Sequence, residues 1–158
     1  MGNPPRILVV DDDESIRKTL ATILNEKGYI VDTAETGKDA IKKSNQKAYH
    51  LALIDIRLPD MMGTELLTSM RETKPKMVKI IITGYPSLQT AVDAVNKGAD
   101  AYVLKPFKMD HVLGMIEKHL RKQQEEKKYS EEKVKEFIET RARELEEENT
   151  VHTKKHRD

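Results

Sequence analysis

The chain has 158 residues, of which 28 are Lys or Arg and 27 are Asp or Glu, so its net charge is +1. This balance excludes a global field that would attract nucleic acid or an acidic surface, and the lack of cysteine excludes disulfides and cysteine-based metal sites. No apolar run approaches the roughly 20 residues of a membrane span and the N-terminus lacks the apolar core of a signal peptide, so we expect a cytoplasmic protein with no direct contact to membrane or nucleic acid.

Short apolar runs rich in β-formers alternate with helical patterns through about residue 120. The predicted strands are 7–10, 29–34, 51–54, 79–83 and 101–104. The first, third and fourth are apolar on both faces, which is typical of a parallel sheet covered by helices. Repeated strand–helix units specify right-handed crossovers, so we predict an open, doubly wound α/β fold with a five-stranded parallel sheet.

Two of the intervening segments carry apolar residues at helical spacing. The sets are Ile16, Leu20, Ile23 and Leu24, and Leu88, Ala91, Val92 and Val95. Each gives one apolar stripe of the kind that faces a core. The stripes end near Gly28 and Gly98, which suit the left-handed position after a helix, whereas Thr36 and Ser87 are predicted N-caps.

The last part of the chain is rich in charged helix formers and contains neither glycine nor proline after residue 120. Val134, Ile138 and Leu145 form a thin stripe, but Arg141 interrupts it, so a solvated helix and a weak coiled coil both remain open. Ser130 favours a fresh helix start and a break nearby. We divide the chain into a folded domain over 4–122 and a charged helical extension over 123–158, a connector or weak coiled coil.

Polar residues follow four of the predicted strands. They are Asp11, Asp12 and Asp13 after the first, Asp55 after the third, Thr83 at the end of the fourth and Lys105 after the fifth. Any one of them alone is equally explained as a helix cap or a surface charge. Together they meet at one edge, where carboxylates about 5 Å apart at an effective dielectric of about 20 repel by roughly 3 kcal/mol per pair. Oxygen ligands favour Mg²⁺, with Mn²⁺ as an alternative, and such an ion is commonly completed by phosphate.

Four stretches, "ILVVDDDESIRKTL", "LALIDIRLPDMMG", "IIITGY" and "GADAYVLKPF", resemble the receiver domain of two-component response regulators, the CheY-like family. The resemblance spans residues 6 to about 120 and implies strand order 2-1-3-4-5. It also implies a metal site in which Asp12 and Asp55 contact Mg²⁺ directly, Asp11 acts through water, and the backbone carbonyl of Arg57 is a further ligand.

The same resemblance makes Asp55 the phosphoacceptor, with Thr83 and Lys105 holding the phosphoryl group. Movement of Thr83 is coupled in the family to an aromatic residue on the fifth strand, here Tyr102. The Lys105–Pro106 peptide bond is cis in the family, and we expect it to be cis here.

The implied function is a signalling switch and not an enzyme, although the domain supports its own phosphotransfer and autodephosphorylation. Its expected partners are a sensor histidine kinase and a downstream protein. A homodimer through helix 4, strand 5 and helix 5, or through the C-terminal helix, is also expected. Arg57 and Tyr85 are bulky residues beside the site, so we predict a phosphorylated form that decays slowly.

Two other readings stay open. A Mg²⁺-dependent phosphohydrolase would use an Asp-x-Asp pair after the first strand, and Asp11 with Asp13 has that spacing, but the role of Asp55 is then unexplained. A scaffold that works without phosphorylation would behave identically when Asp55 is replaced by Asn.

Overall fold

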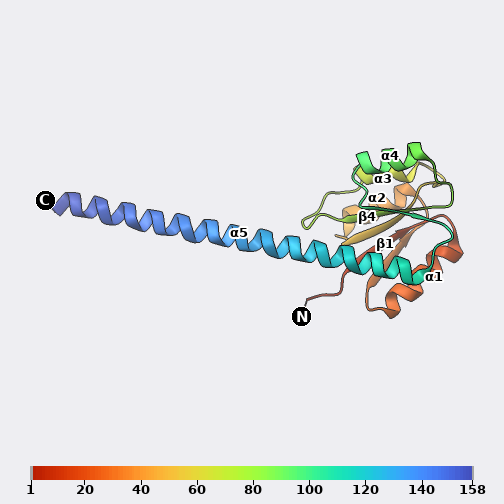
Figure 1. Ribbon diagram of the computed structural model, residues 1–158, viewed down its shortest axis with the longest axis horizontal. Helices are drawn as coiled ribbons and strands as arrows, with labels where there is room; N and C mark the ends of the chain where they lie inside the picture. The colour runs from red at the N-terminus through yellow and green to blue at the C-terminus, as the bar shows by residue number, and fades with distance from the viewer. Residues whose placement is uncertain (1, 158) are drawn as a thin grey trace. The chain divides into compact units, whose positions relative to one another are not determined.

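The computed structural model describes residues 2–157, and side chains through residue 150. Its elements are β1 (Arg6–Val10), α1 (Glu14–Glu26), β2 (Ile30–Ala34), α2 (Gly37–Gln46), β3 (Leu51–Asp55), α3 (Gly63–Ser69), β4 (Val78–Thr83), α4 (Leu88–Asn96), β5 (Ala101–Leu104) and α5 (Met109–Arg157) (Figure 1). The strands form one sheet in the order β2-β1-β3-β4-β5, and all neighbours are parallel. The predicted α/β class and strand order are confirmed.

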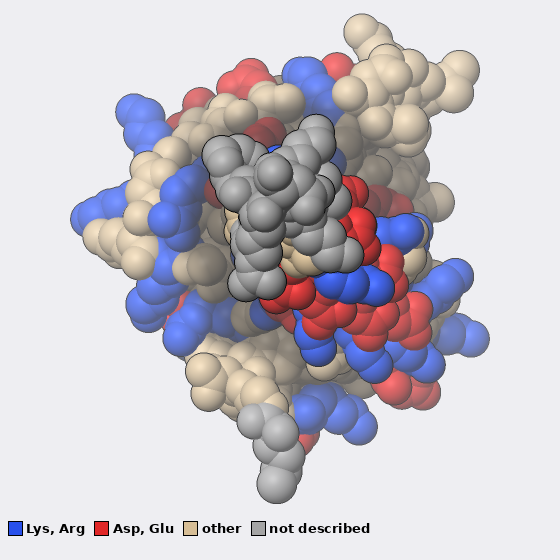
Figure 2. All heavy atoms as spheres, turned by 90° about the vertical axis from the view of Figure 1, so that its left-hand side faces the viewer, with Lys and Arg blue, Asp and Glu red and all other residues tan. Residues whose placement is uncertain are grey.

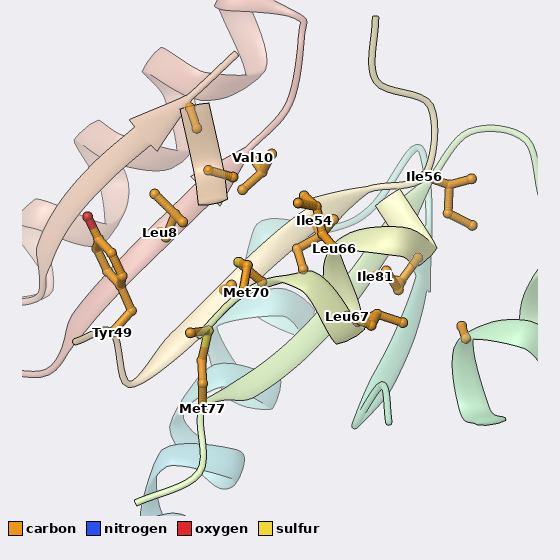
Figure 3. Packing of buried hydrophobic residues seen from close by; sticks show 14 residues of the cluster. Leu8, Val10, Tyr49, Ile54, Ile56, Leu66, Leu67, Met70, Met77 and Ile81 are labelled. Carbon is orange, nitrogen blue, oxygen red and sulfur yellow. The ribbon is translucent and has the colours of Figure 1, made fainter. Parts of the chain in front are cut away.

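The two faces of the sheet are covered by different helices. Alternate residues of β1 point to opposite faces: Leu8 and Val10 lie in one buried cluster, and Ile7 and Val9 lie in the other. The first cluster includes side chains of α2, α3 and α4, and Figure 3 labels members of it on β1, β3, β4 and α3. The second includes side chains of α1 and the first turns of α5. Burial on both faces explains why the central strands read as continuous apolar runs.

The helix ends follow the predicted capping residues. Thr36 Oγ1 accepts the backbone N–H of Asp39 at 3.1 Å, and Ser87 Oγ accepts that of Thr90 at 3.1 Å. Gly28 and Gly98 have φ values of 95° and 92°, a region that side-chain-bearing residues seldom adopt. These ends fix where each chain segment re-enters the sheet.

The apolar stripe of helix α4 is largely exposed. Leu88 is 83% exposed and Val95 is 70% exposed. Ala94 is the fully buried residue of this helix. Spacing shows which residues share a face, but it carries no information on whether another element covers that face. The apolar stripe of α4 is therefore a surface feature.

Helix α5 continues through Ser130, where we expected a break. The fold divides into two compact units, residues 1–123 and residues 124–158. In the second unit Val134, Phe137, Ile138 and Leu145 are exposed. Figure 2 shows acidic and basic side chains next to one another on the face drawn. In residues 2–157, no helix combines the length and the apolar character needed to cross a bilayer.

Candidate functional site

Adjacent strands bring two aspartates together at the carboxyl edge of the sheet. Val10 pairs with Ile54, so Asp11 and Asp55 follow at neighbouring positions. Their side chains are almost fully covered, with residue exposures of 3% and 7%. Asp12 is exposed, and one carboxylate oxygen from each of the three residues lies within 4.8 Å of the others. The predicted acidic cluster is therefore assembled.

Lys105 reaches this cluster from the end of β5. Its Nζ donates to Asp11 Oδ2 at 2.9 Å and to Asp55 Oδ2 at 3.1 Å. The Lys105–Pro106 peptide bond is cis, as expected. One ammonium thus contacts two of the three carboxylates but neutralises the charge of only one, which leaves a net negative charge in the cluster.

The two partners of this ion pair respond differently to their surroundings. Burial raises the pKa of Asp55 and the nearby Asp11 carboxylate raises it further, which outweighs the opposing effect of Lys105. Burial alone would lower the pKa of Lys105, but its hydrogen bonds and charge interactions with Asp11 and Asp55 give a net increase. Lys105 therefore remains charged, while Asp55 carries an unfavourable charge that a second cation would stabilise.

Thr83 lies on β4, the neighbour of β3, and Tyr102 lies on β5, one strand further along the sheet. Thr83 is fully buried at the end of β4, and its Oγ1 accepts the backbone N–H of Tyr85 at 2.9 Å. The Tyr102 hydroxyl forms a hydrogen bond with Thr90 Oγ1 on α4 at 3.1 Å. Tyr102 is thereby linked to α4.

Arg57 connects the loop after β3 to the loop after β4. Its backbone N–H points at Asp55 Oδ1, with a long separation of 3.4 Å. Its guanidinium carbon lies 3.8 Å from the centroid of the Tyr85 ring, a cation–π contact. The two bulky residues that the sequence singled out are therefore in contact with each other.

Two residues that support the site carried no prediction of their own. The Arg17 guanidinium on α1 donates to the backbone carbonyl of Asp11 at 2.8 Å. A Cβ atom at Gly63 would lie 2.0 Å from the Asp55 carbonyl oxygen, so any side chain there would displace the end of β3. Gly63 could have been singled out from the sequence, because it is the glycine that ends the "LALIDIRLPDMMG" stretch.

The sequence matches the family described as response regulator receiver domain over residues 7–117. The chain belongs to this family. It is a receiver domain of two-component signalling, and the cluster of Asp11, Asp12 and Asp55 is typical of the receiver magnesium site. The donor set fits that ion, because it consists of closely spaced carboxylate oxygens with no nitrogen or sulfur ligand.

Similar proteins include regulators and isolated receivers. The chain is 37% identical over 121 residues to the DNA-binding transcriptional regulator NtrC of Proteus hauseri, covering 77% of this chain and 26% of NtrC. This receiver thus spans about a quarter of the length of that relative. A CheY-like receiver from Methanospirillum hungatei is 43% identical with a TM-score of 0.75, over 78% of this chain and 98% of that one.

A third similar structure is a response regulator from Burkholderia pseudomallei with a phosphorylated aspartic acid, a calcium ion and citrate. It is 30% identical with a TM-score of 0.65, and the alignment covers 77% of this chain and 72% of that one. In that protein an acceptor aspartate and a divalent cation are therefore present together.

The raised pKa of Asp55 predicts a pH-dependent stability of the metal-free receiver. Between the usual aspartate pKa of 3.8 and the raised pKa of Asp55, the folded state binds more protons than the unfolded state, so stability falls as pH rises through this range. In EDTA at neutral pH, Asp55→Asn should therefore raise the melting temperature. Thermal unfolding followed by circular dichroism measures this. An equal or lower melting temperature for the variant contradicts it.

Proposed function

We propose that this receiver accepts a phosphoryl group on Asp55 from a phosphohistidine of a sensor kinase and then changes its protein contacts. The observation that carries the proposal is the position of the Asp55 carboxylate, which is buried among two other aspartates and 3.1 Å from Lys105 Nζ. Transfer breaks the phosphorus–nitrogen bond of the donor and forms a phosphorus–oxygen bond to Asp55. The imidazole leaves with the bonding electron pair and is then protonated.

Catalysis of this transfer requires positioning and charge neutralisation more than covalent chemistry. Bound Mg²⁺ or Mn²⁺ would neutralise charge on the acceptor and the incoming phosphoryl group. Asp11, Asp12, Asp55 and the Arg57 carbonyl are the residues that would hold it. Lys105, already directed at Asp55, supplies a second, fixed cation at the acceptor.

The switch that we propose begins at Thr83. Its oxygen accepts the Tyr85 N–H, but its own O–H remains able to donate to a phosphoryl oxygen on Asp55. Movement of this loop would alter the space beside β5, where Tyr102 forms its hydrogen bond with Thr90 on α4. We infer that release of this bond couples phosphorylation to α4.

The surface next to this switch is suited to protein contact. The exposed stripe of α4 includes Leu88, Val92 and Val95, and Leu104 of β5 is exposed as well. Apolar side chains gathered in this way favour binding of a downstream protein or of a second copy through α4, β5 and α5. The exposed stripe of the C-terminal helix is the alternative contact for a homodimer.

A second surface lies beside the acidic cluster. Ser15, Ile16 and Thr19 of α1, with Phe107 after β5, line a shallow recess of about 160 Å³. Its position between the segments that follow Asp13 and Lys105 supports docking of the kinase there, because the donor histidine must reach Asp55.

The position of Asp13 argues against the alternative function, a Mg²⁺-dependent phosphohydrolase. Asp13, the second residue of the Asp-x-Asp pair, uses its side chain to cap α1, accepting the Ile16 N–H at 3.2 Å. Incubation with acetyl phosphate and Mg²⁺ separates the readings. A receiver gains one alkali-labile phosphoryl group per chain, whereas a phosphohydrolase turns over a phosphomonoester at substoichiometric protein. No mass increase would overturn the proposal.

The contact between Arg57 and Tyr85 predicts a slow loss of the phosphoryl group. A cation–π contact at an exposed position is worth about 0.5 to 1 kcal/mol, which corresponds to a rate factor of roughly 2 to 5. Replacing both residues with Ala should accelerate hydrolysis by about this factor, because water reaches the acyl phosphate more easily. Phosphate release after removal of the donor measures the rate.

Tyr85→Phe is the matched control, since it retains the aromatic ring and should decay at the wild-type rate. Unchanged or slower decay in the double Ala variant contradicts the prediction.

A further inference from the structure

The loop between β3 and α3 (residues 56–62) presents Arg57 to the site and is folded back on itself. The Leu58 N–H donates to the Met61 carbonyl at 3.2 Å, and Arg57 forms an isolated antiparallel bridge with Met62. The Gly63 N–H donates to the Ile56 carbonyl. These bonds define the shape of the loop, but none of them joins it to another part of the receiver.

Asp60, at the tip of this loop, makes a connection to a distant helix. Its Oδ1 accepts the backbone N–H of Gly37 at 2.9 Å, and its Oδ2 accepts that of Lys38 at 2.9 Å. Both oxygens of one carboxylate therefore accept hydrogen bonds, and the donors are two consecutive residues 23 and 22 positions earlier in the chain.

These two N–H groups are the first of helix α2 and have no partner within the helix. The third, on Asp39, is bound by the N-cap residue Thr36. The helix start thus has two separate caps, one local and one supplied by the loop. The N–H groups of Lys38 and Gly37 hold the pKa of Asp60 below its usual value, so the carboxylate stays charged at neutral pH.

Packing reinforces the same contact. A Cβ atom at Gly37 would lie 2.4 Å from both Cγ and Sδ of Met61, so the loop rests directly on the backbone of the first turn of α2. Helix α2 is itself fixed to the sheet through Ala40, which is fully buried. The tip of the loop therefore has a rigid support.

We propose that Asp60 is a positioning residue for the phosphorylation site. By holding the first turn of α2, its carboxylate fixes the loop that directs the Arg57 backbone toward the acidic cluster and the Arg57 guanidinium onto Tyr85. The inference rests on the proposed function, because it assigns Arg57 a place in the metal site. Asp60 touches neither metal nor phosphoryl group and acts through the loop.

The test compares two ways of weakening the same helix start. Asp60→Ala removes the cap supplied by the loop, and Thr36→Ala removes the local cap without touching the loop. Both should lower the melting temperature by about 4 °C. Binding of Mn²⁺ alone, measured as free Mn²⁺ by electron paramagnetic resonance, should weaken at least about threefold in Asp60→Ala and stay unchanged in Thr36→Ala.

Equal Mn²⁺ affinity in both variants, or equal weakening in both, overturns the proposal, because Asp60 would then serve only helix stability. Asp12→Asn identifies the site, since it should abolish the binding that is measured. Asp60→Asn keeps one acceptor oxygen and gives an intermediate affinity, which decides the question if the Ala variant does not fold.

Phosphoryl uptake by the wild type is measured separately. A receiver that takes up no phosphoryl group but still shows the Asp60 effect on Mn²⁺ refutes the proposed function and leaves the positioning role intact.

Discussion

We expect Asp55→Asn to abolish incorporation of a phosphoryl group. The amide has nearly the shape of the carboxylate, but it is neutral and a poor nucleophile, so no phosphorus–oxygen bond forms at residue 55. The loss should be complete, because Asp55 is the proposed acceptor, a buried carboxylate that shares the Lys105 ammonium with Asp11. The intact mass of wild type and variant after incubation with acetyl phosphate and Mg²⁺ provides the measurement.

Asp13→Asn is the matched control for this loss. It makes the same change of one charge near the cluster, but Asp13 caps α1, so labelling should persist. A phosphoryl group on Asp55→Asn at the wild-type stoichiometry would show that another residue is the acceptor.

We expect Lys105→Met to slow phosphoryl uptake by about 10² to 10³ fold, the usual cost of removing one fixed donor to a developing charge. Methionine retains an apolar stem of similar length, so the loss reports on the ammonium that now contacts Asp11 and Asp55. Initial rates at saturating Mg²⁺ measure the effect. Lys108→Met, three residues further and exposed, should react at the wild-type rate.

The same substitution should tighten binding of Mg²⁺, because a cation that competes for Asp11 and Asp55 is removed. The two effects therefore have opposite signs, and slower uptake is not explained by a lost metal. A rate within threefold of wild type would show that Lys105 has no part in the transfer.

The acidic cluster was predictable because its position follows from the topology of the sheet. Apolar runs located the strands, and parallel strands deliver their carboxyl ends to one edge, so Asp11, Asp55 and Lys105 were expected to meet before any coordinates were known. Their hydrogen bonds of 2.9 and 3.1 Å confirm the meeting of Lys105 with both carboxylates.

The supporting contacts were not predictable from spacing. Asp60 and Arg17 bind backbone groups of other elements, and such contacts leave no periodic trace in the sequence. The sequence also could not show that Leu88 and Val95 point outward. Helical spacing shows which residues share a face, but it does not show whether another element covers that face. Tyr102 was recognised, but its partner Thr90 could be found only from the packing of α4 on β5.

Helix α4 buries few side chains against the sheet, so it should open locally at a low free-energy cost. A helix of nine residues with a single fully buried side chain gains little free energy from its docking. Its amide hydrogens should therefore exchange with solvent well before those of β1 and β3, whose residues are buried on both faces. Since little free energy holds it in place, we expect that a phosphoryl group on Asp55 would need to supply only a small free energy to displace it.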